Sequence, residues 1–318
     1  TKVSEITLGN ITSAYQMIGK TPDYIEVIRP LSGGVISDDR MTQYMIREFI
    51  LQVTGHRLTK PRIIICVPSF ITDVEKRAVV EAAMSAGSRK AYLIDEPIAA
   101  LIGAGVNIGK ARGNMVVDIG GGSTDIAVIS MGGRVKAASV PVAGNAFDRC
   151  IAQYVQEKFQ IAIGPLTAEA LKKQVACCTK SEFEGVMEVR GHSWETNLPA
   201  RHVIYTRDLY EPVQELASRI AAAARAVLES TPPELAADVS SSGVLLTGGG
   251  SLLRGLASYI AGELHVDVAI APDPLNCVAR GTAISLSEGC YLTAGFRDAT
   301  PKAWHKRLQN NHDPFAGE

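Results

Sequence analysis

The order of apolar and polar positions divides the chain into alternating strands and helices. Three short runs are almost wholly apolar, which is typical of strands buried on both faces of a sheet. They cover residues 62–67, 91–95 and 115–119. Between them, Thr72-Asp-Val-Glu75 has the spacing of a helix capping box, and Glu96-Pro97 places proline in the first turn of another helix. This alternation predicts an α/β protein with a largely parallel sheet.

Apolar residues at helical spacing predict further helices, and alternating residues predict further strands. Asp38 or Asp39 caps a helix whose apolar face carries Met41, Met45, Phe49 and Val53. The other predicted helices cover residues 147–159, 167–177, 206–229, 251–261 and 273–286. The other predicted strands cover residues 24–29, 134–140 and 266–270, with a polar, strand-like stretch at 183–205. The tail from Glu288 is mixed and polar, so we expect it to be peripheral or mobile.

A glycine-rich turn joins two apolar runs in the middle of the chain. The turn holds Gly120, Gly121 and Gly122, followed by Ser123, Thr124 and Asp125, and Asp118 precedes it. Glycines allow positive φ, so successive N–H groups can converge on an anion. Asp118 at the start of the turn is placed to hold a hydrated Mg²⁺, which prefers carboxylate and phosphate oxygens. A tight β-hairpin without a ligand is an equally good interpretation of this turn taken alone.

A second glycine turn makes a ligand site the better interpretation. It comes far downstream, at Thr247-Gly-Gly-Gly250-Ser-Leu-Leu-Arg254-Gly255, between a predicted strand and a predicted helix. Two glycine turns at strand ends indicate two halves that serve one nucleotide. We therefore expect the two turns to face each other across a cleft.

Composition narrows the class of protein. With 318 residues, 46% of them hydrophobic and 20% charged, the chain is long enough for about two soluble globular domains. A formal net charge of −1 gives no reason to expect nucleic acid as a partner. The six cysteines show no C-x-x-C spacing, and Cys66 and Cys277 lie in apolar runs, so buried free thiols are expected. No apolar run approaches the length of a membrane span and no secretory signal opens the chain, so we expect a cytoplasmic protein.

The motifs, in their order, resemble those of the actin-like ATPases and, within them, the MreB family of bacterial actins. The resemblance extends from about residue 18 to residue 286. Its motifs are Pro61-Arg-Ile-Ile-Ile-Cys-Val-Pro68, Val74-Glu-Lys-Arg-Ala-Val79, Asp95-Glu-Pro-Ile-Ala-Ala100, Asn114-Met-Val-Val-Asp-Ile-Gly-Gly-Gly-Ser-Thr-Asp125, Thr231-Pro-Pro-Glu-Leu-Ala-Ala-Asp238 and Leu246-Thr-Gly-Gly-Gly250. It implies the actin-like ATPase fold, with two α/β domains, each with a core and an outer part, that close over ATP and Mg²⁺.

The resemblance also implies the domain limits. The first domain would cover residues 1–117 and be completed by residues 273–318, and residues 1–38 would be a remnant of its outer part. The second domain would cover residues 118–272, with its outer part at about 144–235.

Residue roles follow from the same resemblance. Glu96 matches the glutamate that orients the attacking water, and Ser123 matches a threonine that helps to place this water. The implied nucleotide-binding residues are Asp118, Gly120, Gly121, Gly122, Ser123, Thr124, Glu169, Lys172, Gly248, Gly249, Gly250 and Ser251, with Asp118 also the metal ligand. Glu169 and Lys172 would flank the adenine and ribose. Two plainer interpretations stay open: an ordinary surface ion pair for Glu169 and Lys172, and a first-turn acid that favours the helix dipole for Glu96.

The chain also departs from the family pattern. Residues 1–38 contain no glycine hairpin of the Asp-Leu-Gly-Thr type, the family's first phosphate loop, so we expect a first domain that is incomplete at its N-terminus, as a fragment or a natural short form. We therefore expect these 318 residues alone to bind ATP weakly or not at all, and to form no nucleotide-dependent filaments. Smaller departures are Gly144-Asn-Ala-Phe-Asp148, which lacks the usual acidic residues, and Lys173-Gln-Val-Ala after Lys172. Only Leu58 offers an apolar side chain on the loop that inserts into membrane in many relatives, so membrane attachment is doubtful.

Three functions are compatible with these observations. The first is a cytoskeletal ATPase that polymerises into filaments and organises cell shape and peptidoglycan synthesis, with itself and cell-wall synthesis proteins as partners. The second is a non-catalytic actin-fold scaffold, favoured by the lack of the first phosphate loop. The third is another actin-fold enzyme, such as a sugar kinase or a chaperone ATPase. No substrate domain follows residue 286 and no further candidate base is evident, which argues against the third.

Overall fold

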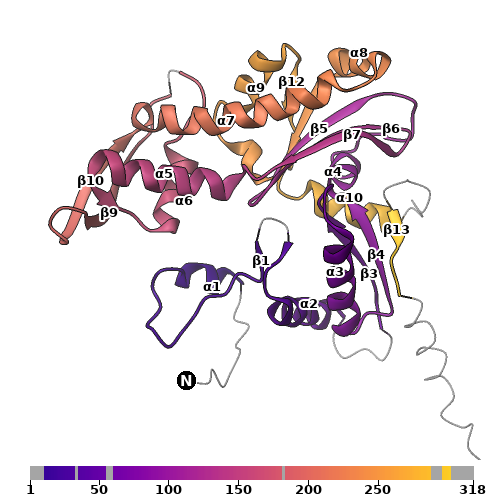
Figure 1. Cartoon of the computed structure of the whole chain (residues 1–318), viewed down its shortest axis with the longest axis horizontal. Helices are drawn as coiled ribbons and strands as arrows, with labels where there is room; N and C mark the ends of the chain where they lie inside the picture. Colours follow the sequence, from indigo (N-terminus) through magenta and orange to yellow (C-terminus); the bar gives the residue numbers. More distant parts are fainter. Residues whose placement is uncertain (1–10, 33–34, 55–59, 181–182, 288–295, 302–318) are drawn as a thin grey trace, which may run out of the picture.

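The computed structural model describes residues 11–32, 35–54, 60–180, 183–287 and 296–301. Leu58, discussed above, and Cys290, one of the six cysteines, lie outside these residues. The described chain forms two α/β domains, as predicted, and Figure 1 shows them above and below a pair of central helices. The central helices are α4 and α10, with bounds Glu96–Gly103 and Cys277–Ser287.

The first domain is built on a small sheet with the strand order β13-β4-β3. Its strands are β3 (Arg62–Val67), β4 (Lys90–Asp95) and β13 (Phe296–Asp298), and β3 and β4 are parallel. Helix α3 (Asp73–Ser85) covers one face of this sheet, and α4 and α10 lie on the other. The predicted capping box of α3 is confirmed, because Thr72 and Glu75 exchange both of its hydrogen bonds.

The N-terminal segment contributes less regular structure to the first domain. It contains α1 (Ile11–Met17), the short strands β1 (Leu31–Ser32) and β2 (Val35–Ile36), and α2 (Asp39–Thr54). The predicted cap of α2 is confirmed by a hydrogen bond from the Met41 N–H to the Asp38 carboxylate. The strand predicted at residues 24–29 is wrong, because this stretch is a loop.

The C-terminal tail was predicted to be peripheral or mobile from Glu288 onward, and only its residues 296–301 are described. Residues 296–298 form the unpredicted strand β13, which pairs antiparallel with β4 at the edge of the first sheet. The Thr300 hydroxyl accepts a hydrogen bond from the Ala91 N–H and helps to hold this strand.

The second domain is built on a five-stranded sheet with the order β12-β11-β5-β6-β7. Its strands are β5 (Asn114–Ile119), β6 (Thr124–Ser130), β7 (Gly133–Val140), β11 (Val244–Thr247) and β12 (Val268–Ile270). Strands β5 and β6 form an antiparallel hairpin, whereas β5, β11 and β12 run parallel. The predicted domain boundary at residue 118 falls inside β5, all of which belongs to this sheet.

Helices and a small outer sheet complete the second domain. The helices are α5 (Gly144–Phe159), α6 (Pro165–Gln174), α7 (Thr206–Glu229), α8 (Pro233–Ser242) and α9 (Leu256–Leu264), with the 3-10 turn η1 (Gly249–Leu252). The outer sheet has the order β10-β9-β8, with bounds Pro199–Tyr205, Val186–Ser193 and Ile161–Ala162. Figure 1 shows this outer sheet at the far end of the upper domain.

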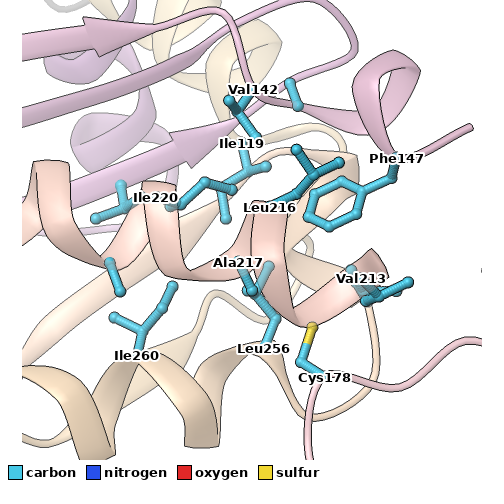
Figure 2. Packing of buried hydrophobic residues seen from close by; sticks show 14 of the residues in the cluster. Ile119, Val142, Phe147, Cys178, Val213, Leu216, Ala217, Ile220, Leu256 and Ile260 are labelled. Carbon is cyan, nitrogen blue, oxygen red and sulfur yellow. The ribbon is translucent and has the colours of Figure 1, made fainter. Parts of the chain in front are cut away.

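Strand alternation decides which side chains fill the main core. Along β5, the side chains of Met115, Val117 and Ile119 are buried beneath α5, α7 and α9. Figure 2 shows Ile119 packed with Phe147, Leu216 and Ile220, which come from α5 and α7. Val116, between these positions, belongs instead to the core around α4. The α4 helix therefore packs against the opposite face of the same sheet.

Candidate functional site

Two aspartates lie opposite each other at the turn end of the β5–β6 hairpin. Asp118 pairs with Asp125 in the hairpin register, and both are buried. Asp118 has the same strand parity as Val116, and Asp125 the same as Ala127. Val116 and Ala127 face α4. The two carboxylates consequently point toward the face on which α4 packs.

A third carboxylate, that of Glu96, comes from the first turn of α4. Burial is the largest cause that raises its pKa, to about 8, and repulsion by Asp125 and Asp118 adds to it. The pKa of Asp118 is raised to about 6, mainly by burial and then by Asp125, although a hydrogen bond from Thr247 opposes the change. The Thr247 hydroxyl donates to Asp118 Oδ1 at 2.7 Å. Three acidic side chains from both domains thus converge on one region.

The second glycine turn lies beside the first and not across a cleft from it, which corrects the predicted arrangement. Strands β11 and β5 are parallel neighbours, with Thr247 next to Asp118. Gly248 has φ +78° and its N–H donates to the Pro274 carbonyl at 2.9 Å. A Cβ at Gly248 would lie 2.3 Å from the Ile119 carbonyl oxygen, so only glycine allows this close approach. The two turns therefore follow adjacent strands, β5 and β11, at the same end of one sheet.

The conformation of the first turn also differs from the prediction. Gly120, Gly121 and Gly122 all keep negative φ, so positive φ is not the reason for glycine at these positions. The Gly120 and Gly121 carbonyls accept hydrogen bonds from the N–H groups of Gly144 and Asn145. The turn is thereby joined to the first turn of α5.

The predicted hydroxyl ligands have different surroundings. Ser123 is half-buried, and its Oγ lies 3.3 Å from Asp125 Oδ2, beside the carboxylates. Thr124 is fully buried and donates to the Val142 carbonyl at 2.5 Å. Ser251 is fully buried and donates to the Gly248 carbonyl at 2.7 Å. The structure thus leaves Ser123 nearest to the acidic cluster, while the other two hydroxyls stabilise the turns.

Glu169 and Lys172 do not pair with each other. Glu169 instead forms an i, i+4 ion pair with Lys173 at 2.6 Å, so the plainer interpretation of an ion pair between Glu169 and Lys172 is wrong. Lys172 instead lies 2.8 Å from Asp148 and donates to the Gly144 carbonyl at 3.0 Å. Because Gly144 contacts the first glycine turn, Lys172 is close to that turn. The Gly144-to-Asp148 segment, although it lacks the usual acidic residues, supplies the partner of Lys172.

Several residues near the site were not predicted. Thr247 was missed, and Asp125 was given only a general role beside the turn. Leu252 and Leu275 are apolar but 53% and 66% exposed, and a Cβ at Gly249 would lie 2.9 Å from Leu275 Cδ2. Exposed leucines beside a glycine turn suit the flat face of a base. Their only sequence signal is an apolar residue in an expected loop.

Magnesium fits this acidic cluster together with phosphate. No group of three or more His, Cys, Asp or Glu side chains in the described ranges is arranged to hold a metal ion. Mg²⁺ is usually bound by one or two carboxylates and by phosphate oxygens, so Asp118 alone suffices as a protein ligand. The raised pKa values of Glu96 and Asp118 show that the site lacks compensating positive charge.

A cavity of about 510 Å³ lies elsewhere in the described residues. It is lined by residues between Ile18 and Arg29, and none of Glu96, Asp118 and Asp125 lines it. No helix in the described part of the chain is long and apolar enough to cross a membrane.

Comparisons with known proteins agree with this fold. The sequence profile of the MreB/Mbl protein family matches residues 2–292. The cell shape-determining protein Mbl of Bacillus subtilis (strain 168) is 45% identical over 275 residues, which are 86% of this chain and 82% of Mbl. The crystal structure of MreB5 of Spiroplasma citri bound to ADP superposes with a TM-score of 0.84 at 34% identity, over 89% of this chain and 85% of that one. A MamK double helical filament has the same fold, with a TM-score of 0.70 at 22% identity over 87% and 84% of the two chains.

Proposed function

The chain belongs to the MreB/Mbl family of actin-like, cell shape-determining proteins, and from this premise we propose that it is a cytoskeletal ATPase. It binds ATP with Mg²⁺ at the end of the second-domain sheet where the two glycine turns lie side by side. It hydrolyses ATP there and polymerises into filaments that organise cell shape and peptidoglycan synthesis.

The convergence of Glu96, Asp118 and Asp125 carries this proposal. Each carboxylate is buried or half-buried beside a glycine turn, and the first comes from a different domain than the other two. Mutual repulsion and burial make such a cluster costly unless a cation joins it. A Mg²⁺–nucleotide complex supplies that charge, and the ADP-bound MreB5 of Spiroplasma citri supports nucleotide binding in this fold.

The proposed roles of the residues come from the family resemblance and are compatible with their positions. Glu96 orients the attacking water and accepts its proton, and Ser123 helps to place this water. Asp118 binds the metal, whose charge polarises the phosphate oxygens when it is bound. With a pKa of about 8, Glu96 is largely protonated near neutral pH, so the cation in the filled site must lower its pKa before it can act as a base.

Filament formation and location belong to the same proposal. The MamK filament has this fold, and the name of Mbl assigns it a role in cell shape. We place the filaments in the cytoplasm, and the described cysteines are free thiols, which suits a reducing compartment. Cell-wall synthesis proteins are the proposed partners besides the chain itself, and direct attachment to the membrane is not part of the proposal.

Steady-state hydrolysis and titration calorimetry with Mg²⁺–ATP test the catalytic roles. Glu96→Gln should lower kcat by ~10²–10⁴, the usual contribution of one positioned acid–base group, with little change in ATP affinity. Asp118→Asn should instead weaken Mg²⁺-dependent binding. Because residues 1–38 contain no Asp-Leu-Gly-Thr hairpin, each assay is also run with such a hairpin fused before Thr1.

Glu195→Gln is the matched control, because Glu195 is an exposed acid in the loop between β9 and β10. It should bind and hydrolyse ATP like the parent protein. Hydrolysis by Glu96→Gln at the parental rate would show that Glu96 is not the base. Absence of turnover in every form, with filaments retained, would identify a non-catalytic scaffold.

A further inference from the structure

Two side chains of the second domain bind the backbone of one residue in the first domain. This residue is Ser69, which is buried and follows β3. Its N–H donates to Asp125 Oδ1 at 3.2 Å, and its carbonyl accepts from Arg134 Nη1 at 2.7 Å. Asp125 lies in β6 and Arg134 in β7, so both polar groups of the Ser69 peptide are satisfied across the domain boundary.

Arg134 makes a second contact with the first domain. Its Nη1 lies 3.3 Å from Asp95 Oδ2, and its guanidinium lies 5.7 Å from the centre of the Phe70 ring. Asp95 is the last residue of β4 and immediately precedes Glu96. We call Ser69, Asp95, Asp125 and Arg134 the interdomain clasp.

The two arms of this clasp end at the two residues assigned to catalysis. Asp125 uses one carboxylate oxygen for the Ser69 N–H and the other for the Ser123 hydroxyl, at 3.2 and 3.3 Å. Arg134 binds Asp95, whose neighbour along the backbone is Glu96. A movement of one domain relative to the other therefore changes the distance between Ser123 and Glu96.

We propose that Arg134 is a positioning residue for ATP hydrolysis, which holds the first domain at the separation where Glu96 and Ser123 can act on the same water. This proposal rests on the proposed ATPase function. Arg134 acts through Asp95 and the Ser69 loop, and its role is distinct from nucleotide binding. The interdomain clasp then links closure of the domains to the chemical step.

The charges around Asp95 explain why an arginine of the second domain matters. A small cavity of about 50 Å³ is lined by Asp95 and by three cationic side chains, those of Lys76, Arg134 and Arg297. Burial raises the pKa of Asp95, and these three cations oppose the change. Lys76 and Arg297 belong to the first domain, whereas Arg134 reaches Asp95 from β7. Arg134 therefore supplies attraction between the domains, which the other two cannot.

The expected effect is on rate and not on affinity. A misplacement of about 1 Å at a reacting group can cost roughly a hundredfold in rate. None of the clasp contacts involves the glycine turn at Gly248–Gly250 or the exposed leucines near it. Arg134→Gln should consequently lower kcat by about 10- to 100-fold and leave the Kd for Mg²⁺–ATP within about twofold.

The test compares Arg134→Gln, Arg134→Lys and Lys136→Gln in the full chain and in the hairpin fusion described above. Arg134→Lys keeps the charge near Asp95 but loses the forked guanidinium, so it should recover part of the rate. Lys136 is an exposed cation two residues further along β7, and Lys136→Gln should hydrolyse ATP like the parent. Hydrogen exchange of residues 67–72 is followed by mass spectrometry in each protein. It should be fastest in Arg134→Gln, because the Ser69 carbonyl loses its donor and the loop that carries the Ser69 N–H is held less firmly against Asp125.

Each outcome separates this proposal from the proposed function. If the parent hydrolyses ATP and Arg134→Gln matches it in kcat, Arg134 does not position the catalytic residues. An equal loss in kcat and in affinity would indicate a general structural role and also contradict the proposal. If neither the parent nor its hairpin fusion hydrolyses ATP, the proposed function fails, and hydrogen exchange alone decides whether Arg134 holds the Ser69 loop.

Discussion

Two contacts at the junction of the domains differ in almost every physical respect. At the crossing of α4 and α10, Gly103 and Gly281 are buried and meet backbone to backbone. A Cβ at either position would lie 1.8 Å from a carbonyl oxygen of the other helix. At the interdomain clasp, Arg134 and Asp95 are 37% and 25% exposed and interact through charge. One contact is apolar and closely packed, whereas the other is polar and partly solvated.

The difference indicates that the two contacts have different functions. Closely packed backbones have one favourable arrangement, because interiors tolerate neither voids nor overlap. A partly exposed ion pair contributes only about 0–1 kcal/mol and can separate and re-form. We therefore infer that the helix crossing is a fixed part of the junction, while the interdomain clasp can open and close.

The largest predicted effect comes from a substitution that separates the two helices at their crossing. In Gly281→Ala, the new methyl group would overlap the Ala99 carbonyl and approach the Gly103 N–H, so α4 and α10 must separate. We expect the free energy of unfolding to fall by about 3 kcal/mol or more, at the upper end for overpacking of a core. The gain of about 1 kcal/mol in helix propensity from glycine to alanine does not offset this loss. Urea denaturation followed by circular dichroism measures it.

Gly262→Ala is the matched control for Gly281→Ala. Gly262 is an exposed helical glycine in α9, and a Cβ there would meet nothing within 4 Å. This variant should gain about 0.5–1 kcal/mol in stability from helix propensity alone. Equal stability of Gly281→Ala and Gly262→Ala would show that the helix crossing is not closely packed.

Local patterns made much of the fold predictable. The capping box of α3 and the apolar run of β3 depend on residues within a few positions of each other, so the sequence indicates them directly. The error at residues 24–29 and the unexpected β13 have another cause. Strand β13 pairs with β4 about 200 residues away, and its short polar sequence does not show that such a partner exists.

The same distinction applies to the site. Asp118 and Asp125 flank a short turn, so counting outward from the turn predicts that they pair. The placement of the two glycine turns side by side depends on pairing between β5 and β11, which no local pattern specifies. Arg134 binds a residue 65 positions away through the packing of whole domains, so its sequence context gave no signal.

A smaller effect concerns Glu96, which lies between the helix crossing and the interdomain clasp. Its pKa is about 8 in the folded chain against 4.5 in the unfolded chain. Between these values the folded state keeps a proton that the unfolded state releases, so the free energy of unfolding falls as pH rises. Glu96→Gln removes this dependence. Without nucleotide, the stability of the variant relative to the parent should increase by about 2 kcal/mol from pH 5 to about pH 6.5.

Denaturation of the parent, Glu96→Gln and Glu195→Gln at several pH values measures this increase. Glu195 is exposed, so Glu195→Gln should follow the parent throughout. A difference between Glu96→Gln and the parent that stays constant from pH 5 to pH 8 would contradict the burial of Glu96 beside the other carboxylates.

The smallest effect is that of opening the interdomain clasp. Arg134→Gln removes the partly exposed ion pair with Asp95 and the hydrogen bond to the Ser69 carbonyl. We expect the free energy of unfolding to fall by only about 1 kcal/mol, because such pairs are weak and water can replace the lost donor. The denaturant dependence should not change, since the surface exposed on unfolding stays the same. Measured beside Gly281→Ala, this variant decides the comparison: a loss of stability as large as that of Gly281→Ala would make the clasp a permanent structural link. A loss several times smaller, together with reduced kcat, would mean that the helix crossing stabilises the fold, while the interdomain clasp serves the proposed alignment of the domains for hydrolysis.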